Sequence, residues 1–414
     1  MRPVVALLIV APLLAGCSSR DRLNPFDPAN PRTGGRPADF RALADDDFVQ
    51  LHWMPQRQSG LTGFQLFRRG PGQATFQTIS GVLSPADGFF TDRTVANGST
   101  YDYQLFYVFT DGLGALPATD RATPGQIRPW VSEFSGGTIA RLTADGRYVT
   151  SRSGGFNSAN DLAADRNTGV VWVSDPFGGK VQVFDPIQGT FVNISGLSEP
   201  GDLALDLADQ TAWICDTGAG AVRHYTRFGT QASPSIDPLD QPIGAAFEQD
   251  NRILWVCERG GDRVRTFLSN GTPQWAAPLS NPSRVAIDST TREGWVTSFT
   301  DGAVYRLSPG GARLDSLTSL GGPIGVAVDP RRGRVWVCDA LAGRLVALRR
   351  DASVEFEVGG LPEVREVAVD LVTGDAWATV PPQGRVIRVG PTGTILAEAT
   401  GLIDPAAIVI DPGR

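Results

Sequence analysis

Seven tryptophans recur along this chain at nearly constant spacing. Trp130 is the first and Trp377 the last, and successive members are separated by 42, 41, 42, 40, 41 and 41 residues. A period near 40 residues is typical of a repeat array, in which no single unit can bury its apolar face without a neighbour. The spacing therefore constrains the fold before any local motif is considered. The other members are Trp172, Trp213, Trp255, Trp295 and Trp336.

The repeat around Trp336 shows what each unit contains. Four β-branched and apolar runs lie between residues 323 and 358, separated by Gly, Pro and Asp, as strands joined by tight turns require. Four antiparallel strands in about 41 residues match one blade of a β-propeller. An acid ends the first run in every repeat, where we expect it to cap a turn by accepting N–H bonds. These acids are Asp165, Asp206, Glu248, Asp288, Asp329, Asp370 and Asp411.

Two further positions repeat with small residues. An alanine stands two residues before the terminal acid in six repeats, and Val409 takes its place in the seventh. We interpret the alanines as the result of crowding where first strands meet around a central axis. A glycine opens the third run in six repeats, with Asp262 in the other, which indicates a hairpin position of positive φ.

The seventh repeat is divided between the two ends of the repeat region. Residues 405–412 supply only a first strand, whereas the strands around Trp130 lack one. We therefore expect the C-terminal strand to pair with the N-terminal strands, which closes a ring and removes an exposed edge. The predicted fold class is all-β, with a seven-bladed β-propeller over residues 125–414 that is closed by the C-terminal strand.

The sequence Pro-Ile-Gly-Val-Ala-Val-Asp-Pro at 323–330, followed by Val-Trp-Val-Cys-Asp at 335–339, resembles NHL-type and YVTN-type propeller repeats. The resemblance extends over about residues 126–414 and implies a propeller fold. Propellers similar to these include metal-dependent lactonases, which place acids and Asn around a divalent ion at the channel. They also include streptogramin lyases, which need a catalytic His on the propeller face.

The N-terminus has the features of a bacterial lipoprotein. Residues 1–16 contain a short basic start and an apolar core, and Leu-Ala-Gly at 14–16 precedes Cys17 as in a lipobox. The resemblance implies cleavage before Cys17 and acylation of that cysteine, and several acyl chains give stable anchoring. Ser18 occupies the position where an inner-membrane retention signal would have Asp, which favours the outer membrane. Residues 17–36 are rich in Pro, Asn and Gly and are expected to form a lipidated tether.

Residues 37–124 predict a second, smaller β domain. Short alternating strands are separated by turn sequences, a pattern typical of a β-sandwich. Trp53 on an early strand and Tyr101 at the start of a late strand resemble the core tryptophan and corner tyrosine of fibronectin type III. The resemblance implies a spacer or adhesion module.

Composition limits the partners and the chemistry. The formal net charge is −7 and no basic stretch occurs, which argues against nucleic acid as a partner. Cys215, Cys257 and Cys338 all lie two residues after a repeat tryptophan, so we interpret them as small buried residues rather than disulfide or metal ligands. His224, the single histidine of the propeller, is expected to lie on the blade surface or to take part in packing, and not to be catalytic. The sequence contains no His cluster, Cys pair or His-Glu-x-x-His run, and we predict no metal site and no cofactor.

A second set of acids ends the second strands, and in an antiparallel blade these ends lie beside the starts of the first strands. We predict that together they form a rim of mixed charge around the channel mouth, which is the default binding surface because turns on a rigid scaffold carry function. The alternative is a solvated rim that only caps turns. The predicted rim residues are Glu133, Asp161, Asp175, Phe177, Asp202, Asp216, Glu258, Arg259, Arg284, Asp339, Arg365 and Glu366.

Three functions remain open from the sequence. The first is a binding or scaffolding lipoprotein of the bacterial cell envelope, without enzymatic activity, that presents the propeller face to a protein, peptide or glycan. The second is a metal-dependent propeller lactonase or a lyase of the streptogramin type. The third is a purely structural envelope protein.

Overall fold

The computed structural model describes residues 24–413, which are almost entirely β-strands and turns. The predicted signal peptide and Cys17 lie outside the described residues. The chain forms two compact units, of which the second takes in the residues from Thr123 onward. Within the described range no helix combines the length and the apolar character that a bilayer crossing would need.

The N-terminal unit contains two sheets. Its core residues Leu51, Phe64 and Tyr103 are completely buried, and the predicted core residue Trp53 is 4 % exposed and packs against Phe64 with 5.5 Å between ring centroids. One sheet has the strands β1 (Arg41–Asp45), β2 (Phe48–His52) and β5 (Phe89–Asp92). The other has β3 (Leu61–Arg69), β4 (Gln77–Thr78), β6 (Tyr101–Phe109), β7 (Gly112–Leu113) and β8 (Ala118–Ala122).

Residues 24–36 do not form the extended tether that composition indicated. Turns held by side-chain hydrogen bonds fold this segment, and Asn30 is buried within it. Phe26 packs edge-on against Tyr107 and Phe109, with centroid separations of 4.8 and 5.1 Å. The polar, Pro-rich composition of the segment does not predict this packing, because a single aromatic residue with two aromatic partners is enough to fix the segment. Residues 24–36, which the composition assigned to a tether, are therefore folded.

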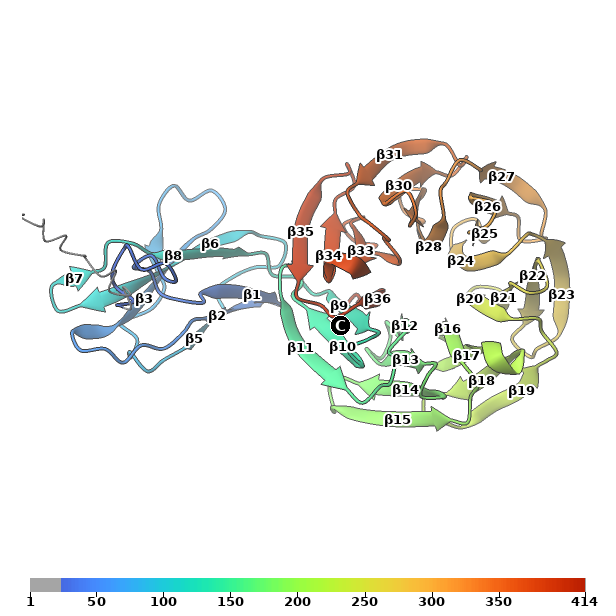
Figure 1. Ribbon diagram of the computed structural model, residues 1–414, viewed down its shortest axis with the longest axis horizontal. Helices are drawn as coiled ribbons and strands as arrows, with labels where there is room; N and C mark the ends of the chain where they lie inside the picture. Colours follow the sequence, from blue (N-terminus) through green and yellow to red (C-terminus); the bar gives the residue numbers. More distant parts are fainter. Residues whose placement is uncertain (1–23, 414) are drawn as a thin grey trace, which may run out of the picture. The chain divides into compact units, whose positions relative to one another are not determined.

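The second unit is a ring of seven four-stranded antiparallel sheets, with the first strands nearest the centre and the fourth strands outermost (Figure 1). The first strands are β12 (Leu162–Ala164), β16 (Pro200–Asp206), β20 (Pro242–Glu248), β24 (Pro282–Asp288), β28 (Pro323–Asp329), β32 (Val367–Val369) and β36 (Pro405–Asp411). The second strands are β13 (Val171–Asp175), β17 (Thr211–Asp216), β21 (Ile253–Glu258), β25 (Glu293–Ser298), β29 (Arg334–Asp339), β33 (Ala376–Val380) and β9 (Arg128–Glu133).

The outer half of each blade completes the predicted propeller. Short 3₁₀ turns, Thr217–Ala219 and Pro381–Gln383, connect strands two and three in two blades. The third strands are β14 (Lys180–Asp185), β18 (Ala221–Thr226), β22 (Arg263–Leu268), β26 (Ala303–Leu307), β30 (Arg344–Arg349), β34 (Arg385–Val389) and β10 (Thr138–Leu142). The fourth strands are β15 (Thr190–Ser195), β19 (Gln231–Ile236), β23 (Pro273–Pro278), β27 (Arg313–Leu317), β31 (Val354–Gly359), β35 (Ile395–Thr400) and β11 (Val149–Gly154).

The predicted ring closure is confirmed. Strand β36, the last of the chain, pairs antiparallel with β9, and Val409 lies opposite Trp130. Two hydrogen bonds hold the turn before β36. The backbone carbonyl of Asp404 accepts from the N–H of Phe134, and the carboxylate of Glu133 accepts from the N–H of Ile403. The blade edge that β9 would otherwise expose is therefore covered.

The repeated alanines have a different cause from the predicted crowding at the axis. Each lies directly across the strand pair from the blade tryptophan, as Ala204 does from Trp213. Residues paired in this way project on the same face only about 5 Å apart, so a small partner leaves room for the indole. The indole then packs into the next blade, where Trp213 shares a core with Leu254 and Phe267.

The predicted turn caps are confirmed in all seven blades. The acid that ends the first strand accepts a hydrogen bond from the N–H two residues later, as Asp329 does from Arg331. The position that opens the third strand has positive φ, 54° at Gly384 and 47° at Asp262. At Gly384 a Cβ atom would lie 2.5 Å from the carbonyl oxygen of Leu402, which excludes most other residues.

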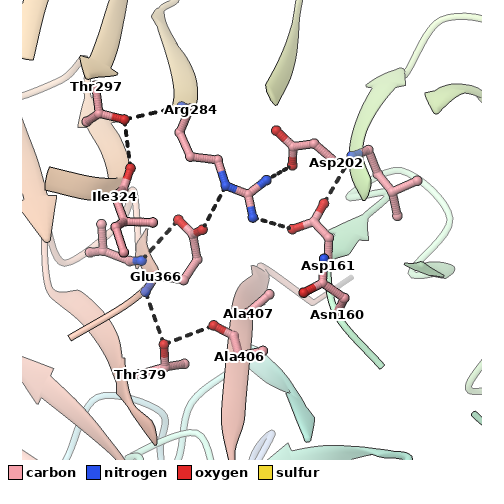
Figure 2. Close-up of polar contacts among 12 residues, drawn as sticks. Asn160, Asp161, Asp202, Arg284, Thr297, Ile324, Glu366, Thr379, Ala406 and Ala407 are labelled. Atoms are coloured by element: carbon pink, nitrogen blue, oxygen red, sulfur yellow. Dashed lines mark hydrogen bonds and ion pairs between the residues drawn. The ribbon is translucent and has the colours of Figure 1, made fainter. Parts of the chain in front are cut away.

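The residue two positions after the blade tryptophan is either a buried cysteine or a residue with a hydroxyl group. Cys215, Cys257 and Cys338 are buried free thiols, as predicted. A hydroxyl at the same position bridges blades: Thr297 accepts from the N–H of Arg284 and donates to the carbonyl of Ile324 (Figure 2). Ser132 and Thr379 make the same bridge.

Candidate binding site at the channel mouth

The five acids that end second strands do not form an exposed rim. Glu133, Asp175, Asp216, Glu258 and Asp339 are completely buried. Each accepts hydrogen bonds from backbone N–H groups of the loop that leads into the first strand of its blade. Each is also paired with a basic side chain of the same blade. These carboxylates therefore fix the loops around the channel mouth and are not themselves presented to a ligand.

Asp339 shows how such an acid fixes a loop. One carboxylate oxygen accepts from the N–H groups of both Gly321 and Gly322 at 2.8 Å, and the other contacts Arg344 Nε at 2.9 Å. A buried carboxylate with this many donors is well compensated for its lost hydration. The sequence predicted the position of these acids but not their burial. For Asp339 the basic partner is on the next strand and the N–H donors are almost 20 residues earlier, and for Glu133 the N–H donor Ile403 is at the other end of the propeller sequence.

A second set of predicted rim residues does come together, inside the channel. One residue at the start of the first strand in each blade repeats at a spacing of 40 to 42 positions, and we call these seven residues the axial ring. In it the guanidinium of Arg284 lies among three carboxylates (Figure 2). The axial ring consists of Asp161, Asp202, Gly244, Arg284, Gly325, Glu366 and Ala407.

Arg284 is the centre of this arrangement. Its Nε lies 3.3 Å from Glu366 Oε2, its Nη2 lies 3.6 Å from Asp161 Oδ1, and its Nη1 contacts Asp202. The acids have a second role between blades. Asp161 accepts from the N–H of Leu203 at 3.0 Å, and Asp202 accepts from the N–H of Ala245 at 2.8 Å. All three acids of the ring are therefore committed to partners in the protein.

Charges in the axial ring influence one another strongly. Burial raises the pKa of Asp161, and the neighbouring Asp202 raises it further. Burial also raises the pKa of Glu366. Burial alone would lower the pKa of Arg284, but the three carboxylates outweigh this effect and raise it. The ring thus holds a permanent cation, while burial disfavours the charged forms of Asp161 and Glu366.

The channel widens from the axial ring into a larger cavity. A cavity of about 140 Å³ lies at the ring itself. Above it, on the face where first strands begin, lies a cavity of about 550 Å³ that we call the mouth pocket. Asp202, Arg284 and Glu366 line both cavities. The opposite end of the channel has a separate cavity of about 490 Å³, lined in part by Arg166 and Phe247.

Two predicted rim arginines line the mouth pocket without a counter-ion. Within residues 24–413, the side chains of Arg365 and Arg259 make no hydrogen bond or ion pair. The guanidinium of Arg365 lies 5.9 Å from the ring centroid of Phe134. Burial lowers the pKa of Arg365, and the charge of Arg284 lowers it further.

Exposed apolar side chains surround the mouth. Phe177 is 73 % exposed and meets Phe134 edge-on at 5.6 Å between centroids. Leu341 and Phe299 are 69 % and 38 % exposed, and both lie near Gly322. Large apolar residues exposed together on a rigid scaffold mark an interaction surface more often than scattered single residues do.

Sequence reasoning missed several residues of the mouth pocket. Asn160 and Ser283 line it, and each directly precedes a residue of the axial ring. Gln241, Asn281 and Phe299 come from loops and turns whose direction the repeat pattern does not specify. The adjacency of Asn160 and Ser283 to the ring residues was the available signal, because consecutive residues at the start of a first strand both reach the channel mouth.

His224 packs inside its blade, which is the second of the two positions that the sequence left open. It is 5 % exposed, and its two ring nitrogens lie 2.8 Å from the hydroxyls of Thr211 and Ser233. Across residues 24–413, no group of three or more His, Cys, Asp or Glu side chains is arranged to hold a metal ion.

Comparison with known proteins supports the propeller fold. No protein-family profile matches the sequence, and no curated protein is similar to it. A functionally unknown protein from Desulfotomaculum acetoxidans is 13 % identical, with a TM-score of 0.60 over 69 % of this chain and 99 % of that one. Virginiamycin B lyase from Staphylococcus aureus is 16 % identical, with a TM-score of 0.54 over 60 % of this chain and 87 % of the lyase. A catalytically inactive histidine-to-alanine variant of that lyase, solved with quinupristin, is 17 % identical, with a TM-score of 0.50 over 57 % and 82 %. At these identities the likeness establishes the fold alone.

Proposed function

We propose that this protein is a lipid-anchored binding protein of the bacterial cell envelope that recognises a protein, peptide or glycan at the channel mouth of its propeller. The observation that carries the proposal is the mouth pocket of about 550 Å³, lined by Arg259 and Arg365 and bordered by exposed apolar side chains. Pockets of this size with a few converging polar groups are typical ligand sites.

The buried acids beneath the mouth support this proposal. They hold the surrounding loops by N–H bonds, so a ligand would meet a surface that is ordered before it binds. Preorganisation lowers the entropic cost of association. The N-terminal unit would then be a fibronectin type III-like spacer between this surface and the membrane, with an outer-membrane location favoured by Ser18.

The binding proposal can be tested by matched surface variants. Phe177→Ser with Leu341→Ser removes exposed apolar area at the mouth, whereas Leu314→Ser with Leu396→Ser removes it from fourth strands on the outside of the ring. When cells are treated with a crosslinker, the Leu314→Ser, Leu396→Ser variant should give the same crosslinked products as the wild type. The Phe177→Ser, Leu341→Ser variant should lose these products. If both double variants crosslinked equally and kept the wild-type melting temperature, the mouth would not be the binding surface.

Anchoring is a separate part of the proposal. Labelling with an alkynyl fatty acid should modify the wild-type protein and fail with Cys17→Ser, which should also leave the membrane fraction. Persistent labelling of the Cys17→Ser variant would contradict lipidation at this residue.

A lyase activity is the alternative that the structural likeness favours. The related lyase is catalytically inactive when one histidine is replaced by alanine. In this chain the only propeller histidine is buried with both nitrogens bonded, which supports binding over lyase chemistry. Cleavage of quinupristin by the purified protein, followed by mass spectrometry, is the direct test of this alternative.

A further inference from the structure

The side chains of the mouth pocket that remain free share one chemical property. The two carboxylates in its wall, Asp202 and Glu366, are both bonded to Arg284 and to backbone N–H groups. The polar side chains that make no hydrogen bond or ion pair within residues 24–413 can all donate. They are Asn160, Gln241, Arg259, Asn281, Ser283 and Arg365. A pocket with free donors and no free carboxylate is suited to a ligand that accepts hydrogen bonds and carries negative charge.

Arg365 is the strongest of these donors. Its side chain is partly buried and is influenced by the charge of Arg284, and its guanidinium lies 5.9 Å from the ring centroid of Phe134. A partly buried cation without a counter-ion is costly, and a bound anion would offset that cost. The backbone of Arg365 is fixed as well, because its carbonyl accepts from the N–H of Gly325 at 3.1 Å and its N–H donates to Thr379 at 3.1 Å.

We propose that the mouth pocket binds a singly charged carboxylate, held by the guanidinium of Arg365 in a pocket that Arg259 also lines, and that the apolar part of the ligand lies against Phe299 and Ile324. This inference rests on the proposed binding function and gives it a chemical class. The planar guanidinium fork matches the two oxygens of a carboxylate, which makes the contact directional as well as electrostatic.

A carboxylate fits this pocket better than a phosphate. Arg284 in the wall of the pocket is already paired with Asp202 and Glu366, so the uncompensated positive charge of the pocket comes from Arg259 and Arg365. A doubly charged phosphate would be repelled by these acids over the short distances of a low-dielectric site, whereas one negative charge is tolerated. The ligand carboxylate could belong to a free organic acid, to a peptide C-terminus or to an acidic side chain.

Four small probes separate these possibilities. N-acetylphenylalanine carries a C-terminal carboxylate beside an apolar group, and N-acetylphenylalanine amide is its neutral counterpart. N-acetylglutamate amide carries the charge on a side chain, and inorganic phosphate is the dianionic probe. Ligand-observed NMR with the full-length protein in detergent should give saturable binding of N-acetylphenylalanine in the millimolar range typical of fragments, with its amide and phosphate at least about tenfold weaker. The side-chain probe then shows which kind of peptide carboxylate is preferred.

Two arginine variants locate the site. Arg365→Gln should weaken carboxylate binding by about tenfold or more, because it removes a charge-assisted hydrogen bond. Arg166→Gln is the matched control, since Arg166 is exposed and lines the cavity at the opposite end of the channel. It should bind like the wild type. Melting temperatures of both variants verify that they fold.

The outcomes distinguish this inference from the proposed function. Equal affinity for the acid and its amide, tighter binding of phosphate, or an unchanged Kd in a folded Arg365→Gln variant overturns the carboxylate site. If the amide binds as well as the acid and Phe299→Ala weakens both, the mouth remains a binding site and only its chemistry is wrong. If none of the four probes binds at about 10 mM, the carboxylate inference fails, and the crosslinking experiment alone decides the proposed function.

Discussion

The imidazole of His224 lies flat against the indole of Trp213, with 3.9 Å between ring centroids and 3° between the ring planes. The two residues are paired across β17 and β18, so the stack sits on the face that packs against the next blade. Burial lowers the pKa of His224 to about 4, because a charged imidazole would lose its hydration there. The neutral ring is therefore the form that the fold uses.

This pairing predicts a pH-dependent cost for His224→Gln. A histidine whose pKa in the folded state is below its unfolded value stabilises the fold above about pH 6.5, and this contribution is lost as the pH falls through about 4. The variant should lose about 1–3 kcal/mol at pH 7 through the stack and two hydrogen bonds. Urea unfolding of both proteins at several pH values measures the difference, which should shrink toward pH 4. A constant difference would show that His224 does not titrate in this range.

Repeat columns carry most of the fold information in this sequence. Trp130 and Val409 could be assigned to one blade because each filled a gap in the same 41-residue pattern, and their strands do pair. The terminal acids of first strands also followed from the pattern, since an acid two residues before an N–H group caps a turn by local geometry alone. Local interactions of this kind depend only on sequence neighbours.

The candidate site depends on contacts that no local pattern contains. Arg284 meets Asp161, Asp202 and Glu366 only because one residue from each blade reaches the axis. The repeat predicted that these residues would be near one another, but it could not say which of them are free. Their commitment to Arg284 and the free state of Arg365 follow from side-chain directions in the assembled ring, which the spacing does not determine.

Removing the central cation should destabilise the propeller. Arg284→Met leaves three carboxylates in the axial ring without their guanidinium, and breaking such a buried set costs about 3–5 kcal/mol at neutral pH. Burial already raises the pKa values of Asp161 and Glu366 in the folded protein, and loss of the guanidinium would raise both further, so the deficit should grow with pH and shrink toward pH 4. Unfolding in guanidinium chloride at pH 4 and pH 8 measures this trend.

A control for Arg284 is an arginine whose acid partner remains in contact with water. Arg385 pairs with Glu398, which is 39 % exposed, so Arg385→Met should cost about 1 kcal/mol or less. If the two variants lost equal stability, or if the loss at Arg284 did not depend on pH, the axial cluster would have no special electrostatic role.

Blade-to-blade hydroxyl bridges predict a contrast between Thr and Cys at one repeat position. Thr379 accepts from the N–H of Glu366 and donates to the carbonyl of Ala406, so Thr379→Val should leave two buried groups unsatisfied and cost about 1–3 kcal/mol. In the preceding blade Gly325 donates directly to the Arg365 carbonyl, which replaces the bridge. Cys338→Val should therefore cost less than about 1.5 kcal/mol. Denaturant unfolding of both variants provides the comparison, and equal losses would show that the hydroxyl is not a bridge that matters to stability.

Deleting residues 403–414 should open the ring. The deletion removes β36, exposes the ladder groups of β9, and takes the partner Val409 away from Trp130. Glu133 also loses the N–H of Ile403 while it remains paired with Arg152. An uncovered strand edge next to an exposed indole favours association between molecules, so the truncated protein should melt at lower temperature and elute as oligomers. Removing only Gly413 and Arg414 leaves β36 in place and should preserve a monomer-like elution profile and the full-length melting temperature. If the longer deletion also behaved like the full chain, the seventh blade would hold together without its first strand, and the C-terminal strand would not be what closes this propeller.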